Sequence, residues 1–200
     1  MKKAVIFDWG GVLIDNPEEG LLNYWAQHLE VPIERLKTAK DKHNADFQRG
    51  RFNEADFWYR ICNELDVPVP QVHSLFGDSF KAVYQPKDEM FELVESLRGN
   101  HLTCLLSNTE MPAVAYFGEL GYKMFDQTVF SCVEGFIKPE RWIYEIALSK
   151  LSVSPDETIF VDDKVEYLAG ASALGIEGIL FENPAQVKNE LKRAGIKIKT

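Results

Sequence analysis

Four short apolar runs constrain the fold of this chain more than any other feature of its sequence. They are AVIFD at 4–8, LTCLLSN at 102–108, TIFVDD at 158–163 and EGILFEN at 177–183, and QTVFS at 127–131 is a weaker fifth. None alternates apolar and polar residues, which is typical of parallel strands covered on both faces. Because helical patterns separate the runs, the sequence predicts an α/β fold with a doubly wound parallel sheet and right-handed crossovers.

The segment from residue 16 to residue 86 has a different pattern. It contains no strand run, and helical patterns follow one another. NPEEGLLNYWAQHL begins with Asn16 as the expected cap and Pro17 as the first helical residue, and NEADFWYRICNEL begins with Asn53 as the cap. We therefore expect an α/β core domain of residues 1–15 and 87–200, with residues 16–86 inserted into it as an all-helical cap subdomain.

Charge and cysteine content exclude several classes of protein. The chain has 22 Lys and Arg against 31 Asp and Glu, and its net charge of −9 without a basic block argues against nucleic-acid binding. The opening MKK leads into only four apolar residues, too few for a signal peptide or a membrane span. Three cysteines without a C-x-x-C spacing indicate neither a disulfide framework nor a zinc site. We expect a cytoplasmic protein that binds no membrane, and a monomer, with a dimer as the alternative.

Polar side chains stand at the ends of three predicted strands. Asp8 ends the first run, Ser107 and Asn108 end the second, and Asp162 and Asp163 end the third of the four main runs. In an open parallel sheet, ligands bind outside the carboxyl ends of the strands. One Asp after a strand is more often only the cap of the next helix. Polar groups from three strands together predict a ligand site.

Four segments carry a resemblance to a known family. FDWGGVLID, LLSNTE, SCVEGFIKPERWIYEIA and IFVDDKVEYLAGASALG resemble, in order and spacing, the four motifs of the haloacid dehalogenase-like (HAD) hydrolase superfamily. The helical insert lies where subfamily I members carry a small cap. QRGRFNEADFW, residues 48–58, resembles a segment of the bacterial glucose-1-phosphatase-like group. The resemblance implies a Rossmann-like core and a hydrolase, most often a phosphatase.

The resemblance also implies a role for individual residues. Asp8 would attack phosphorus and form an aspartyl phosphate. Ser107 and Asn108 would bind the phosphoryl group, and Lys138 would bind it too while stabilising the transfer step.

A magnesium ion is implied in the same way. Mg²⁺ would be held by Asp8, the main-chain carbonyl of Gly10, and Asp162 and Asp163, because this cation takes oxygen ligands. Asp163 is expected to bind it directly, and Asp162 directly or through a water molecule. The implied function is Mg²⁺-dependent hydrolysis of a small phosphorylated metabolite, with a sugar phosphate expected first.

Gly10 departs from the family pattern. Most HAD phosphatases have a second Asp there, which protonates the leaving oxygen and later activates water. Glycine keeps the main-chain carbonyl but supplies no acid or base. Such help is worth about 10²–10⁴-fold, so we expect a slower phosphatase that favours good leaving groups such as sugar 1-phosphates. Lys164 and Tyr167 also stand where motif four commonly has Ser and Asn.

The cap should supply substrate recognition. Its candidates for reaching the site are His43, His73, Arg49 and Arg51. The two histidines fit solvated helix faces better than a catalytic role. The cap aromatics are expected to form core between helices and not a ligand site; they are Trp25, Phe57, Trp58, Phe76 and Phe80.

Two other functions compete with the phosphatase. A 2-haloacid dehalogenase uses the same Asp against carbon without a metal, but Gly10 and the Asp162–Asp163 pair argue against it. A catalytically weak regulatory or binding protein is the second alternative. The presence of Asp8, Lys138 and both motif-four carboxylates argues against that reading.

Overall fold

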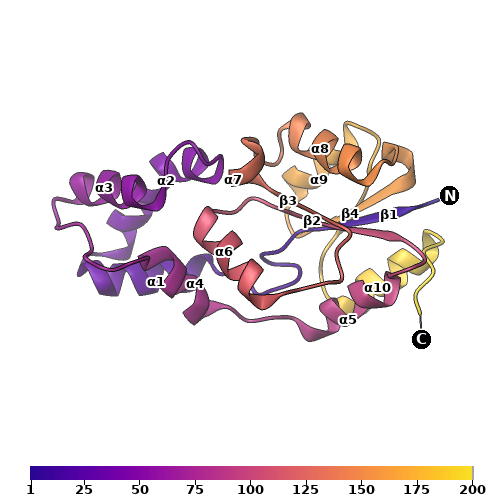
Figure 1. The fold of residues 1–200 in the computed structure, drawn as a ribbon, viewed down its shortest axis with the longest axis horizontal. Coiled ribbons are helices and arrows are strands. Elements are labelled where there is room, and N and C mark those ends of the chain that lie inside the picture. The colour runs from indigo at the N-terminus through magenta and orange to yellow at the C-terminus, as the bar shows by residue number, and fades with distance from the viewer. Residues whose placement is uncertain (200) are drawn as a thin grey trace.

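The computed structural model describes residues 1–199, which contain a five-stranded parallel sheet (Figure 1). The strand order is β3-β2-β1-β4-β5, and all neighbours are parallel. The strands are β1 (Ala4–Phe7), β2 (Leu102–Ser107), β3 (Gln127–Phe130), β4 (Thr158–Asp162) and β5 (Glu177–Leu180). Each lies inside one of the five predicted runs, and the predicted α/β fold is confirmed.

Helices cover both faces of the sheet, which explains why the strand sequences do not alternate. Val5 and Phe7 of β1 join one apolar cluster, while Ala4 and Ile6 join a second cluster. Successive residues of a strand point to opposite faces, so both faces of β1 are buried. Figure 1 shows α8 (Arg141–Leu151) and α9 (Val165–Ser172) on one side, and α5 (Asp88–Leu97) and α10 (Pro184–Arg193) on the other.

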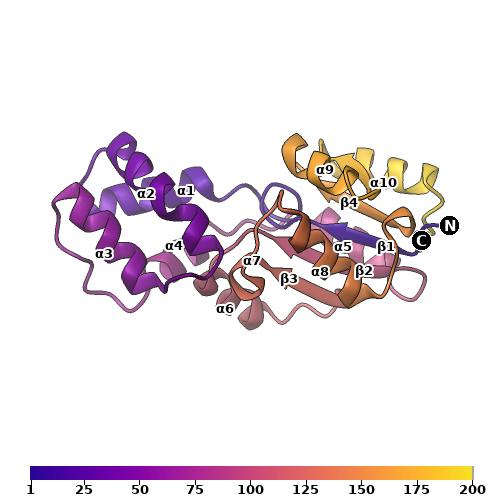
Figure 2. The same ribbon diagram turned by 90° about the horizontal axis from the view of Figure 1, so that it is seen from above.

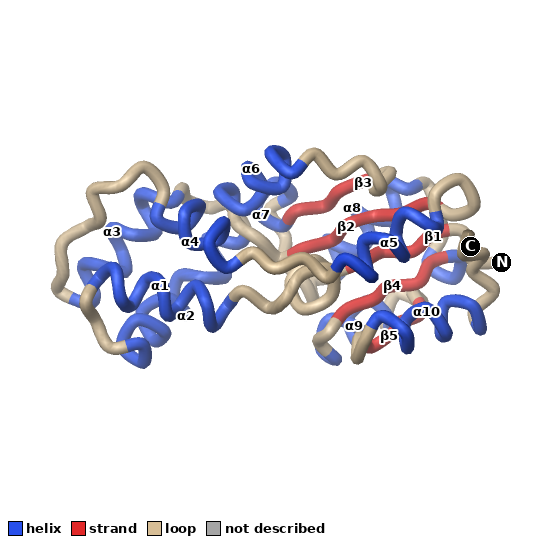
Figure 3. Tube along the Cα trace, turned by 90° about the horizontal axis from the view of Figure 1, so that it is seen from below, coloured by secondary structure: helices blue, strands red, loops and turns tan. Residues whose placement is uncertain are grey.

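Four further helices form a second body beyond one end of the sheet (Figures 2 and 3). They are α1 (Glu18–Leu29), α2 (Ile33–Gln48), α3 (Glu54–Leu65) and α4 (Leu75–Val83). Between this body and the sheet lie α6 (Met111–Leu120) and the short α7 (Ser131–Glu134) (Figure 1). A 3₁₀ turn, Pro155–Glu157, directly precedes β4. No helix within residues 1–199 has the length and apolarity to cross a membrane.

The two chain segments that connect the bodies lie side by side. The main-chain N–H of Asp15 donates to the carbonyl of Gln85 at 2.9 Å, and that of Lys87 donates to the carbonyl of Leu13 at 2.9 Å. The side chains of Asp15 and Lys87 form an ion pair. Because the chain enters and leaves the helical body through these two hydrogen-bonded segments, we propose residues 16–86 as a cap subdomain.

The two predicted helix starts have different outcomes. The side chain of Asn53 accepts the N–H of Asp56 at 2.9 Å and caps α3, as predicted. The predicted start of α1 is wrong by one residue, since the helix begins at Glu18 with Pro17 in the cap position. Pro17 has no N–H, so the side chain of Asn16 accepts from the next amide, that of Glu18, at 3.0 Å.

Candidate active site

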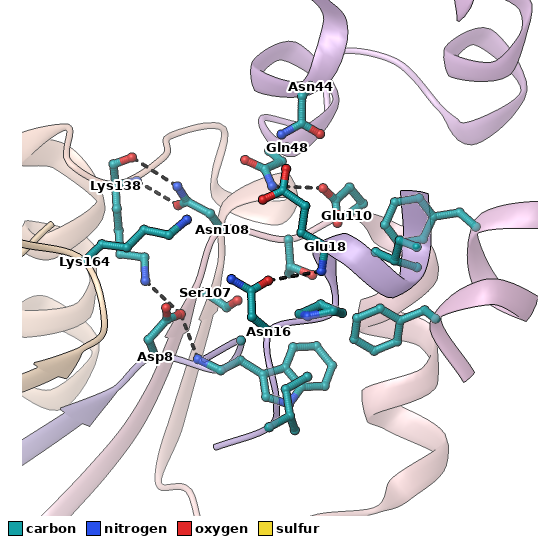
Figure 4. Close-up of a pocket in the computed structure, with 18 of the residues that line it drawn as sticks. Asp8, Asn16, Glu18, Asn44, Gln48, Ser107, Asn108, Glu110, Lys138 and Lys164 are labelled. Atoms are coloured by element: carbon teal, nitrogen blue, oxygen red, sulfur yellow. Dashed lines mark hydrogen bonds and ion pairs between the residues drawn. The ribbon is translucent and has the colours of Figure 1, made fainter. Parts of the chain in front are cut away.

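A cavity of about 190 Å³ opens at the carboxyl ends of the central strands (Figure 4). On the side of the sheet it is lined by residues predicted from the motifs, namely Asp8, Gly10, Ser107, Asn108 and Lys138. On the opposite side it is lined by residues of α1, α2 and α4. The cavity therefore lies between the two bodies, next to the strand ends where a ligand was expected.

Lys138 lies between two carboxylates. Its Nζ is 2.8 Å from Asp8 Oδ1 and 2.6 Å from Asp162 Oδ2, and its side chain is fully buried. Burial alone would lower the pKa of Lys138, but the charges of Asp8 and Asp162 and the hydrogen bonds to them outweigh that effect and raise the pKa. Lys138 is therefore held as a cation against Asp8.

Asn108 fixes the position of Lys138. The N–H of Lys138 donates to Asn108 Oδ1 at 2.8 Å, and Asn108 Nδ2 donates to the carbonyl of Lys138 at 3.0 Å. The side chain of Asn108 thus holds the loop that carries the lysine. Ser107 is different, because it lines the cavity (Figure 4) and its side chain makes no hydrogen bond with any residue in 1–199.

Three carboxylates meet beside this pair. Asp8, Asp162 and Asp163 each offer one oxygen, and these oxygens lie within 4.8 Å of one another. Burial, and then the charge of Asp8, raises the pKa of Asp162 and of Asp163. A cation bound among the three oxygens would reverse that effect, because it favours the ionised form of each carboxyl.

The unused oxygens show how a hard cation fits here. Asp163 Oδ1 is buried and has no hydrogen-bond partner in residues 1–199. Both oxygens of Asp162 are engaged, Oδ2 by Lys138 and Oδ1 by the N–H of Lys164 at 2.9 Å. The cluster thus has a free carboxylate oxygen on Asp163 and a less available one on Asp162. Oxygen donors of this kind suit Mg²⁺.

Gly11 allows Asp163 to approach so closely. A Cβ built on Gly11 would lie 2.3 Å from Asp163 Oδ2, and the residue has a φ of +87°. Any other residue would be strained by its backbone and would displace the carboxylate.

Tyr167 has a role that the family pattern did not predict. Its ring lies under two ammonium groups, with Lys138 Nζ 4.8 Å and Lys164 Nζ 5.1 Å from the ring centroid. Asn108 Nδ2 is 3.4 Å from its hydroxyl. The tyrosine therefore contacts the loop of Asn108 and offers both lysines an aromatic face.

The structure does not bring the four predicted cap candidates into the cavity. His43 Nε2 lies 2.7 Å from Glu64 Oε1, and Arg51 pairs with Asp46 at 2.7 Å. Arg49 pairs with Glu140, and His73 is exposed. None of the four lines the cavity. The preferred interpretation of the histidines as surface residues agrees with their positions.

The aromatic residues of the cap need a correction. Phe57 and Trp58 are buried core, as expected. Trp25, Phe76 and Phe80 are also buried, but they line the cavity as well. The prediction that they are buried core is confirmed, but it was incomplete for these three, because sequence spacing places them on the apolar side of a helix without showing that this side also borders a cavity.

Sequence reasoning missed most of the polar residues on the cap side of the cavity. They are Asn16, Glu18, Lys40, Asn44 and Gln48. Glu110, on the core side of the cavity, was missed as well. A signal was present, since Lys40, Asn44 and Gln48 are spaced four residues apart and so share one face of α2.

Glu110 is the most unusual of these residues. It stands at the start of α6, is buried, and accepts a hydrogen bond from Gln48 Nε2 at 2.9 Å. Burial raises the pKa of Glu110 to about 7, against the opposing effect of the Gln48 hydrogen bond. The pKa of this carboxyl is therefore well above that of an exposed glutamate.

Comparison with known proteins identifies the family. Residues 2–175 match the family described as haloacid dehalogenase-like hydrolase. The chain belongs to the haloacid dehalogenase-like hydrolase family. The fold agrees, since a structure of the HAD family enzyme bt-2542 from Bacteroides thetaiotaomicron superposes with a TM-score of 0.74 over 91% of this chain and 95% of that chain, at 21% identity. That structure is described as a complex with magnesium and inorganic phosphate.

Relatives within the family differ in length and in name. The sesquiterpene phosphatase astK of Aspergillus oryzae is 28% identical over 96% of this chain and 95% of its own. The D-ribitol-5-phosphate phosphatase of Bacteroides thetaiotaomicron is 25% identical over 96% of this chain and 97% of its own. Mouse acyl-CoA dehydrogenase family member 10 is 30% identical over 95% of this chain, which spans only 19% of that protein.

Proposed function

We propose that this HAD-like hydrolase is an Mg²⁺-dependent phosphatase that acts on a small phosphorylated metabolite, with a sugar phosphate expected first. The observation that carries the proposal is the position of Asp8, which lines the cavity, contacts the buried ammonium of Lys138 and lies beside the carboxylates of Asp162 and Asp163. The names of the two full-length relatives, both phosphatases, support it.

The proposed reaction has two steps on Asp8. A carboxylate oxygen of Asp8 attacks phosphorus, the bond from phosphorus to the leaving oxygen breaks, and the electron pair goes to that oxygen. The leaving oxygen takes a proton from water, because Gly10 has no acid to supply one. Water then attacks phosphorus of the aspartyl phosphate, which releases inorganic phosphate and restores the carboxylate.

The neighbouring residues bind and orient the phosphoryl group. Lys138 offsets the charge of Asp8 against that of the phosphate and stabilises charge during transfer. The free hydroxyl of Ser107 donates to a phosphoryl oxygen, with the main-chain amide of Asn108 beside it. Mg²⁺ held beside Asp8 would supply positive charge that offsets the charge of the phosphoryl group.

The residues proposed to hold the cation are Asp8, the carbonyl of Gly10, Asp163 and Asp162. Asp163 is the direct ligand because its Oδ1 has no other partner within residues 1–199. Asp162 acts directly or through water, since Lys138 and the N–H of Lys164 already engage its oxygens.

Phosphate release with and without metal tests this function. We expect turnover of sugar phosphates and acetyl phosphate with Mg²⁺, loss of turnover with EDTA, and at least a 10³-fold loss for Asp8→Asn, since removal of the nucleophile removes the first step. Asp88→Asn, an exposed residue of α5, is the matched control and should keep wild-type rates. Metal-independent chloride release from 2-chloropropionate, without phosphate release, would instead identify a dehalogenase.

A further inference from the structure

The cap wall of the cavity carries a group of neutral amides, Asn16, Asn44 and Gln48, which we call the amide cluster (Figure 4). Asn44 and Gln48 lie one turn apart on α2, and Asn16 lies just before α1. The three amides come from two separate segments of the sequence. They line the same cavity as the residues proposed to bind the phosphate. The part of a substrate that extends from the phosphate-binding end toward α2 would contact this cluster.

Much of the hydrogen-bonding capacity of the amide cluster is unused. Within residues 1–199, neither amide atom of Asn44 has a partner, and the same holds for Asn16 Nδ2 and Gln48 Oε1. An amide offers N–H donors and a carbonyl acceptor together. A hydroxyl group also donates and accepts, so it satisfies such a pair of atoms better than an anion, which only accepts.

The charges on this wall disfavour a second anionic group. Lys40 is buried, but its Nζ is 2.6 Å from Glu18 Oε1 and 3.4 Å from Asp41 Oδ1. Glu110 lies nearby, bound by Gln48. Within residues 1–199, the cation of the cap wall is therefore paired with its own neighbours and offers little charge to an additional phosphate or carboxylate. Lys164, the other lysine beside this part of the cavity, lies on the opposite wall.

The apolar part of the wall lies in the same cavity as the free amides, which disfavours a purely apolar ligand. Trp25, Phe76 and Phe80 line the cavity, and the indole N–H of Trp25 is used by Ser79 Oγ at 2.7 Å. A prenyl chain would contact these rings, but it would also cover the free amides and leave them without partners. Burial of unpaired polar groups is unfavourable.

We propose that the amide cluster, with Glu110, is a subsite for an uncharged polyhydroxylated leaving group, such as a polyol or a monosaccharide. This inference rests on the proposed phosphatase function and assigns its leaving-group specificity to three cap residues. The hydroxyls hydrogen-bond to Asn44, Gln48 and Asn16, while the carbon skeleton packs on the aromatic rings.

A substrate panel tests the subsite. The wild type, Asn44→Leu and Gln48→Leu are assayed with Mg²⁺ on ribitol 5-phosphate, phenyl phosphate, farnesyl monophosphate and a sugar bisphosphate. We expect the wild type to prefer ribitol 5-phosphate. Each variant should lower the ratio of kcat/KM for ribitol 5-phosphate to that for phenyl phosphate by about tenfold, as expected for one or two lost hydrogen bonds.

Matched controls separate the subsite from general effects of the substitution. Asn63→Leu and Gln27→Leu place the same change on exposed positions of α3 and α1 that do not line the cavity, and they should keep the wild-type ratio. Asn44→Leu is the cleaner variant, since the Asn44 side chain makes no hydrogen bond within residues 1–199. A wild-type preference for farnesyl monophosphate or the bisphosphate, or an unchanged ratio in Asn44→Leu, overturns the inference.

A binding measurement distinguishes failure of the subsite from failure of the proposed function. Calorimetry of ribitol 5-phosphate against Asp8→Asn, with and without Asn44→Leu, reports the subsite without turnover. If the wild type hydrolyses phenyl phosphate but the two proteins bind ribitol 5-phosphate equally, the subsite alone is wrong. If the wild type hydrolyses nothing but Asn44→Leu weakens binding about tenfold, the subsite stands and the phosphatase function is wrong.

Discussion

Gly10 stands where most HAD phosphatases have their acid and base, and its surroundings leave room for a side chain. A Cβ built there would lie 3.4 Å from Pro17 Cδ, which is its nearest neighbour, and the φ of Gly10 is not in the left-handed region. The glycine is therefore not required by the local backbone, unlike Gly11 beside it. Its absence of a side chain is a chemical property of the site and not a steric necessity.

We therefore predict that Gly10→Asp accelerates turnover. An aspartate here would protonate the leaving oxygen and activate water, and general acid–base help is worth about 10²–10⁴-fold. The gain should be largest for alkyl phosphates with poor leaving groups and smallest for acetyl phosphate. Steady-state kcat with Mg²⁺ on both substrates is the measurement.

Gly10→Asn is the control for Gly10→Asp, because it has nearly the same shape but no acid. It should remain at or below the wild-type rate on both substrates. Equal rates for the Asp and Asn variants would show that proton transfer at position 10 does not limit this enzyme.

At the scale of elements, the contact between α2 and the start of α6 depends on one buried carboxyl. Gln48 at the end of α2 donates to Glu110, which precedes α6. Burial raises the pKa of Glu110 from 4.5 to about 7 in the folded protein. Between those two values the native state binds more protons at this residue than the unfolded chain does, so stability falls as pH rises.

The predicted pH effect of Glu110 is large enough to measure. The contribution of Glu110 to stability is fully present below pH 4.5 and is lost as pH rises through about 7, at a total cost of about 3 kcal/mol. Glu110→Gln keeps the shape and cannot ionise, so at pH 8 it should raise Tm by about 6–12 °C over the wild type. At pH 4.5 the two proteins should unfold at similar temperatures.

Glu119→Gln, an exposed position of the same helix, is the control for Glu110→Gln and should shift Tm by no more than about 2 °C at either pH. A constant difference between Glu110→Gln and the wild type from pH 4.5 to 8 would contradict the assigned ionisation.

The strands could be predicted from the sequence because burial on both faces leaves a plain apolar run, as in β1 and β4. Asp8 and the Asp162–Asp163 pair at the ends of β1 and β4, and Lys138 in the loop after α7, could be predicted because their segments resemble the motifs of a large family. The burial of Glu110 could not be predicted, since a glutamate at the start of a helix is common in sequences and usually lies at the surface. Its burial depends on Gln48, 62 residues earlier in the chain, and single-sequence patterns carry no information about such a contact.

At the scale of the whole molecule, the cavity exists only while the helical body stays against the sheet. Besides the paired connections, the bodies meet where α4 contacts α6, and where the end of α2 reaches α7 and the loop that follows it. Arg49 pairs with Glu140 there, and Gly50 approaches Cys132 so closely that a Cβ on Gly50 would lie 2.1 Å from the Cys132 carbonyl oxygen. Since α2 carries Asn44 and Gln48, we expect this contact to help position the amide cluster relative to Asp8.

Gly50→Ala should therefore move α2 away from the sheet and weaken substrate recognition. Gly121→Ala is the matched control, because both glycines have a left-handed φ, +68° and +65°, but a Cβ on Gly121 meets no atom within 4 Å. Gly121→Ala should lose only the stability that backbone strain costs, about 1–2 kcal/mol, which lowers Tm by roughly 2–8 °C. Gly50→Ala should lose more stability and also raise KM for ribitol 5-phosphate several-fold. If KM stays at the wild-type value while Tm falls as in the control, the contact at Cys132 stabilises the chain without positioning the cap.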